Sequence, residues 1–176
     1  MTSFVYVKLG REQTQHARRE AAHRSTTARL YGARNGTNAD TGLSSALADE
    51  IGALCELAVA NYVGLPTNFG RDYNPDGADV GPIEVRGRKM GSAYHDVRIY
   101  ETDIRKADYI VGASIMENGP EALIRLNGWN YTQEAFDNST VAPFAPHPVK
   151  GQARHHSVTA LRPMATLIDE LTNRRQ

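Results

Sequence analysis

The chain has 176 residues, and its 20 Lys and Arg residues balance its 20 Asp and Glu residues, so that its formal net charge at pH 7 is zero. This balance excludes the overall basic character of many nucleic-acid-binding proteins, so such binding would have to come from local patches. The single Cys55 excludes an internal disulfide, and no apolar run is long enough to span a membrane. We therefore expect one domain, residues 1–176, of a cytoplasmic protein.

The N-terminal part is expected to begin with a short edge strand or an ordered arm at residues 4–9, where apolar residues alternate weakly. Residues 10–34 then form a basic segment that is rich in helix formers up to about Arg24. Arg18 and Arg19 lie in the middle of this segment. Two interpretations stay open: the arginines contact a phosphate backbone, or they belong to a solvated helix face.

Residues 46–63 predict an amphipathic helix that Ser44 or Ser45 caps and that ends at Gly64. Glu56 lies on the side opposite the main apolar stripe, among small or apolar residues. A carboxylate in such surroundings needs a partner, and an arginine is one candidate for it.

The stretch 71–89 contains the residues that indicate chemistry. Gly81 and Pro82 interrupt two β-prone pieces and predict a tight hairpin turn, which would place Asp79 across from Glu84 with their Cβ atoms about 5 Å apart. Side chains alternate along a strand, so one face would be charged and the other would enter the core. The charged face would hold Asp79, Glu84, Arg86 and Arg88, and the apolar face Val80, Ile83 and Val85.

Two carboxylates held side by side repel each other unless a cation joins them. An oxygen-rich pair with open positions suits Mg²⁺ or Mn²⁺ better than a softer metal. Such an ion can activate water and neutralise charge on a phosphoryl group, while a neighbouring cation stabilises the transition state. The pattern therefore predicts hydrolysis of phosphodiester bonds.

At these residues the chain resembles the PD-(D/E)XK nuclease superfamily, whose signature is an acid at the end of one strand and (D/E)-x-K on the next. Asp79 matches the first acid, Glu84 the second, and Arg86 takes the position of the lysine. Residues 52–58, GALCELA, match the G-x-x-x-E-x-A helix pattern of small bacteriophage-type members. A literal Pro-Asp pair ends at Asp76, which is an alternative for the first acid.

The resemblance implies an α/β (α+β) fold with a mixed central β-sheet flanked by helices and a restriction-endonuclease-like core. It also implies a Mg²⁺- or Mn²⁺-dependent deoxyribonuclease, with Glu56, Asp79 and Glu84 as metal ligands and Asp79, Glu84 and Arg86 in catalytic roles. A guanidinium stays protonated at any working pH, so Arg86 would act as an electrostatic stabiliser and not as a general base. Contacts to DNA would come from Arg18, Arg19, Arg88 and Lys89, and Lys89 could also reach back into the site.

The arginine in the lysine position supports an alternative, a catalytically inactive nuclease-like module that binds DNA or protein, such as a phage regulator or anti-defence factor. A structural or assembly protein is a third class, but it leaves the acidic residues without explanation. The oligomeric state stays open, and a homodimer is one possibility.

The rest of the chain predicts further strands and helices of the same domain. We expect strands around 97–100, at 108–115 in the centre of the sheet, and at 122–126, the last one closed by residues 127–129. A short helix is expected at 132–136, an irregular proline-rich segment at 141–151, a basic surface loop around 154–156, and a final helix after Pro163.

Overall fold

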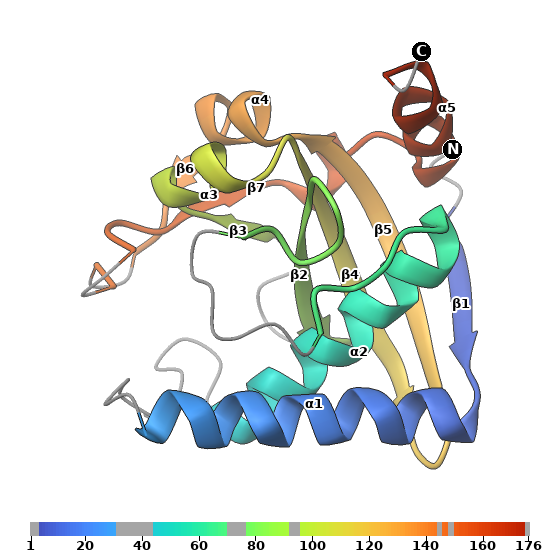
Figure 1. Cartoon of the computed structure of the whole chain (residues 1–176). Coiled ribbons are helices and arrows are strands. Elements are labelled where there is room, and N and C mark those ends of the chain that lie inside the picture. The colour runs from blue at the N-terminus through green and yellow to red at the C-terminus, as the bar shows by residue number, and fades with distance from the viewer. Residues whose placement is uncertain are drawn as a thin grey trace.

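The computed structural model describes residues 4–30, 44–69, 77–91, 96–143, 146–147 and 150–174. Within these ranges the chain is a mixed α+β protein with a four-stranded mixed sheet, a second, antiparallel sheet of three strands, and five α-helices (Figure 1). The first half contains β1 (Val5–Leu9), α1 (Arg11–Leu30), α2 (Ser45–Val63), β2 (Ile83–Lys89), β3 (Val97–Ile99) and α3 (Glu101–Lys106). The second half contains β4 (Tyr109–Asn118), β5 (Ala122–Tyr131), α4 (Thr132–Asp137), β6 (Thr140–Val141), β7 (Arg154–His156), a 3₁₀ turn (Val158–Ala160) and α5 (Met164–Asn173).

The larger sheet has the strand order β1-β5-β4-β2. β2 runs parallel to β4, and the other two pairings are antiparallel. β4 is an inner strand, as its apolar sequence predicted, and seven consecutive residues from Tyr109 to Ile115 are buried. β1 lies at the edge, as expected for the N-terminal strand. The chain from β2 to its parallel neighbour β4 passes through β3 and α3, and this crossover brings α3 next to β2.

α2 covers one face of the larger sheet, and α1 packs on α2 (Figure 1). The main core lies between α2 and the sheet and includes Leu54, Ile83, Val111 and Ile124. Gly87 sets the distance between β2 and α2, because a Cβ atom there would lie 2.9 Å from Cys55 Sγ and 3.0 Å from the Ile51 carbonyl oxygen. The helix side of β2 is therefore closely packed.

The smaller sheet, in the order β3-β7-β6, packs on the opposite face of β4. Val97, Ile99 and Leu161 form a second core there with Ile110, and a Cβ atom on Gly112 would lie 2.8 Å from Val97 Cγ2. Because paired residues of adjacent strands share a face, Glu84 and Arg86 point to the same side as Ile110 and Gly112. The charged face of β2 is therefore turned toward β3 and α3.

The predicted boundaries of α2 are confirmed. Ser44 is the N-cap, and its hydroxyl accepts a hydrogen bond of 3.3 Å from the Leu47 N–H. Gly64 ends the helix in the left-handed conformation with φ of 68°, which costs a glycine little. None of the described helices is long and apolar enough to cross a membrane.

Several expectations were wrong. The strand β5 does not end before residues 127–129 but continues to Tyr131. Gly128 has φ of 142° and no Cβ atom, so the Arg162 carbonyl can approach it, and the register between β4 and β5 shifts next to this residue. The expected surface loop at 154–156 is β7, in which His155 and His156 are buried. α1 continues past Arg24 to Leu30, and α3 was not predicted.

Candidate functional site

The predicted tight turn is present at Gly81 and Pro82. Val80 and Ile83 exchange backbone hydrogen bonds of 3.0 and 2.9 Å across it, and Gly81 has φ of 52°, which favours glycine. Val80, Ile83 and Val85 are buried in the main core, as expected for the apolar face. The first limb of the hairpin is short, so that β2 is its only extended strand among the described residues.

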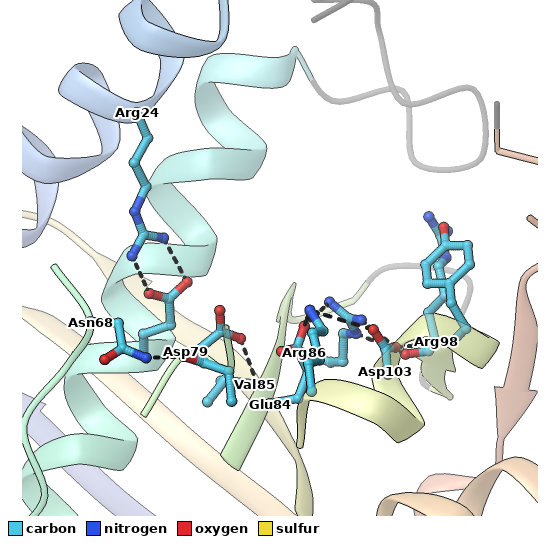
Figure 2. Close-up of polar contacts among 12 residues, drawn as sticks. Arg24, Asn68, Asp79, Glu84, Val85, Arg86, Arg98 and Asp103 are labelled. Carbon is cyan, nitrogen blue, oxygen red and sulfur yellow. Dashed lines mark hydrogen bonds and ion pairs between the residues drawn. The ribbon is translucent and has the colours of Figure 1, made fainter. Parts of the chain in front are cut away.

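Asp79 folds its side chain onto the start of β2. Its Oδ2 atom accepts a hydrogen bond of 2.8 Å from the Val85 N–H, which places the carboxylate beside Glu84 (Figure 2). Burial and, second, the charge of Glu56 raise the pKa of Asp79 to about 6, although the Val85 N–H and the charges of Arg86 and Lys106 act in the opposite direction. Asp79 therefore carries a negative charge that its surroundings only partly compensate.

Glu84 is the most deeply buried acid of the predicted pair, with 1 % of its surface exposed. Its Oε1 atom lies 2.7 Å from Lys106 Nζ and 2.8 Å from Arg86 Nη1. Its Oε2 atom is also buried, and among the described residues it has no hydrogen-bond partner. Burial is the main reason why the pKa of Glu84 is raised to about 7. The charges of Arg86 and Lys106 act against this rise, and the charge of Asp79 adds to it.

Arg86 is anchored on the side away from Asp79. Its Nη2 atom lies 2.5 Å from Asp103 Oδ2, and its Nε–H donates a hydrogen bond of 3.0 Å to the Arg98 carbonyl. Asp103 is completely buried and also accepts a hydrogen bond of 2.9 Å from the Tyr100 N–H at the start of α3. Burial lowers the pKa of Arg86, but the charges of Glu84 and Asp103 outweigh this and raise it above its ordinary value. Arg86 therefore bridges Glu84 to Asp103 and, among the described residues, makes no ion pair with Asp79.

Glu56 forms an ion pair with an arginine, which is one of the two roles predicted for it; the other is that of a third metal ligand. Both carboxylate oxygens accept hydrogen bonds from Arg24, at 2.8 and 2.7 Å, and the Arg24 guanidinium lies 5.1 Å from the centre of the Phe69 ring. Glu56 is close enough to Asp79 to raise its pKa, yet its oxygens are occupied. In the described part of the chain, no group of three or more His, Cys, Asp or Glu residues is arranged to hold a metal ion. Asp76, the alternative first acid, lies outside the described residues.

Three residues of this site were missed by the sequence analysis: Arg24, Asp103 and Lys106. Each reaches the site from an element that is remote in sequence or was not predicted, and no local pattern connects it to Glu84 or Glu56. Lys106 is the most informative of the three about the site. It extends from α3, and its largely buried ammonium group contacts Glu84 of β2, the strand on which Arg86 stands at the position of the expected lysine.

The four residues predicted to contact DNA differ in their surroundings. Arg18 joins α1 to its neighbours, with contacts of 3.0 Å to Glu50 Oε1, 2.7 Å to Asn118 Oδ1 and 2.9 Å to the Gly119 carbonyl. Arg19 and Lys89 are exposed. Arg88 is half-buried and shares the face of Arg86, and both burial and the charge of Arg86 lower its pKa.

Comparisons of the chain with protein-family models, with curated proteins and with solved structures found no match.

Proposed function

We propose that this protein is a nuclease of restriction-endonuclease-like fold that hydrolyses DNA phosphodiester bonds with a divalent metal ion, Mg²⁺ or Mn²⁺, held by Asp79 and Glu84. The observation that carries the proposal is the buried Glu84 Oε2 atom, which has no hydrogen-bond donor among the described residues and belongs to a carboxylate beside a second acid. An unsatisfied buried carboxylate oxygen is costly unless a proton or a cation reaches it.

The donor set fits such an ion. Mg²⁺ binds oxygen atoms, and proteins commonly supply one or two carboxylates while water and substrate phosphates complete its coordination. Asp79 and Glu84 are two carboxylates from adjoining positions of one turn and strand, and burial and then a neighbouring carboxylate raise their pKa values, so that a cation would stabilise their charged forms. The ion would supply positive charge toward the phosphodiester and increase the acidity of water.

The protein's own residues would orient and polarise the substrate. Arg86, fixed by Asp103 and Glu84, keeps a permanent positive charge next to the acidic pair, where it can stabilise charge that develops on a phosphoryl group. Lys106 Nζ contacts the same Glu84 Oε1 atom as Arg86 Nη1 and adds a second positive charge beside the acidic pair. The parallel pairing of β2 with β4 and the cover of α2 on one face support the nuclease-like core.

The test is a cleavage assay on duplex and single-stranded DNA with Mg²⁺, with Mn²⁺ or with EDTA. We expect cleavage only with metal, and loss of cleavage in Glu84→Gln, which keeps the shape of the side chain but removes its charge. Glu117→Gln is the matched control, because Glu117 lies exposed at the far end of β4. Absence of metal-dependent cleavage, or equal cleavage by Glu84→Gln and wild type, would overturn the proposal.

A second candidate is a catalytically inactive module of the same fold that binds DNA or protein. The observation in its favour is that two of the three proposed metal ligands already form ion pairs within the chain. Glu56 pairs with Arg24, and Glu84 pairs with both Arg86 and Lys106. This candidate predicts DNA binding in EDTA that weakens with salt and that survives Asp79→Ala. The nuclease proposal instead predicts that Asp79→Ala loses cleavage.

A further inference from the structure

Two cations, Arg86 and Lys150, pack on the ring of Tyr100, and Arg88 is a third cation that interacts with this ring. Arg86 Cζ lies 5.9 Å and Lys150 Nζ 5.5 Å from the centre of the Tyr100 ring. Arg88 follows Arg86 by two residues on the same face of β2 and interacts electrostatically with Arg86, Asp96 and Tyr100. β2 and the segment before β7 therefore bring positive charges to Tyr100 at the start of α3.

The acids nearby do not compensate all of these charges. Glu84 and Asp103 form their ion pairs with Arg86 and Lys106. Within the described ranges, the side chains of Arg88 and Lys150 make no ion pair with a carboxylate. Asp96 acts on Arg88, and Glu84 and Asp103 act on Lys150, only from beyond ion-pair distance, so these two positive charges are partly compensated.

The electrostatic surroundings of Arg88 and Lys150 oppose their charged forms. Burial, and then the charge of Arg86, lower the pKa of Arg88. Lys150 is exposed as a residue, but its ammonium group packs on the Tyr100 ring, and this local burial together with the charges of Arg86 and Lys106 lowers its pKa. An anion that binds between these groups would relieve the repulsion, and a phosphate suits an arginine fork and a lysine point charge.

We propose that Arg88 and Lys150, with Arg86 as their common neighbour, form an anion subsite that binds a backbone phosphate of a nucleic-acid strand. Arg88 lies two residues, about 7 Å, beyond Arg86 along β2, so this phosphate is a neighbour of the one at Asp79 and Glu84 and not the reacting one. The choice of a nucleic-acid strand as the ligand of this subsite rests on the proposed function. Its chemistry would also accept inorganic phosphate, and the experiment separates the two.

The experiment measures the affinity of the metal-free full chain, in EDTA, for a fluorescein-labelled single-stranded oligodeoxynucleotide over a range of salt concentrations. We expect Arg88→Gln and Lys150→Gln each to weaken binding about tenfold and to flatten the slope of log K against log salt by about 0.7 per cation removed. Arg11→Gln, at an exposed position at the start of α1, is the control and should bind like wild type. Equal affinity of wild type, Arg88→Gln and Lys150→Gln would overturn the subsite.

A second measurement is the shift of the unfolding temperature by inorganic phosphate. We expect phosphate to stabilise the wild type and not the double variant, and the single variants to unfold no earlier than wild type in buffer because each removes a repelled charge. One outcome would overturn the nucleic-acid form of the proposal: inorganic phosphate raises the unfolding temperature only when Arg88 and Lys150 are present, but the oligonucleotide binds equally well to wild type, Arg88→Gln and Lys150→Gln. Because binding is measured in EDTA, loss of metal-dependent cleavage with this binding intact would count against the nuclease proposal alone.

Discussion

Replacing Arg24 by alanine tests whether the ion pair between α1 and α2 compensates a buried charge. Glu56 has 6 % of its side chain exposed, and Arg24 contacts both of its oxygens, at 2.8 and 2.7 Å. Removal of one partner of a fully buried pair costs about 3–5 kcal/mol. Since 34 % of the Arg24 side chain is exposed and water can enter after its removal, we expect a loss of about 2–3 kcal/mol for Arg24→Ala.

Arg18→Ala is the matched control, because Arg18 also joins α1 to α2 but pairs with Glu50 and not with Glu56, Asp79 or Glu84. Arg18 and Glu50 have 33 % and 27 % of their side chains exposed, so water screens this pair and its loss should cost about 1 kcal/mol. The assay is urea unfolding at pH 7 in EDTA. If Arg24→Ala is no less stable than Arg18→Ala, the argument that Arg24 compensates a buried carboxylate is refuted.

The same variants show whether Glu56 can act as the third metal ligand that the resemblance implies. Without Arg24, both Glu56 oxygens become available beside Asp79. A ligand at ten times its Kd stabilises the folded state by about 1.4 kcal/mol. We expect 10 mM Mg²⁺ to stabilise Arg24→Ala more than wild type or Arg18→Ala, and an equal response of all three proteins would exclude Glu56 as a ligand.

Three further predictions concern the interior around β2. The raised pKa values of Glu84 and Asp79 mean that the folded state binds more protons than the unfolded chain, so the free energy of unfolding should fall as the pH rises from about 4 to about 7. Glu84→Gln should flatten this fall by about 3 kcal/mol in pH-dependent urea unfolding, and an unchanged slope would contradict the assignment. Gly87→Ala should destabilise the protein by about 1–3 kcal/mol because its Cβ atom meets α2, whereas Gly10→Ala, with nothing within 4 Å, should stay within about 0.5 kcal/mol of wild type in the same assay. Burial raises the pKa of Cys55, so iodoacetamide should label it at pH 8 only in denaturant, and labelling of the native protein would show that α2 opens.

The features that were predicted correctly depend on residues that are close in sequence. The Gly81-Pro82 turn follows from the conformations that those two residues allow, and the placement of apolar and charged side chains on opposite faces of β2 follows from strand geometry. The cap of α2 at Ser44 is likewise a local arrangement. These local rules were enough to place Asp79 beside Glu84.

The features that were missed depend on which distant segments meet. Arg24 reaches Glu56 because α1 crosses α2, and Lys106 reaches Glu84 because the chain between β2 and β4 returns through α3. The Asn127-Gly128 pair is a turn signal in sequence, but here the missing Cβ accommodates the Arg162 carbonyl and β5 continues. Local patterns identify such residues as charged or permissive, but the partner is fixed only by the packing.

The order of charges decides where an ion or a substrate would enter the site. Figure 2 shows a row that runs from the Arg24 contact past Asp79 to Glu84, Arg86 and Asp103. Glu56, Glu84 and Asp103 each have a cation of the chain against them, whereas Asp79 has none within ion-pair distance among the described residues. Asp79 is also less buried than its three acidic neighbours, and the unsatisfied Glu84 Oε2 belongs to the adjacent carboxylate. The least compensated charge of this row is therefore that of Asp79, because Arg86 is held by Asp103 and Glu84 and makes no ion pair with Asp79 in the described part of the chain.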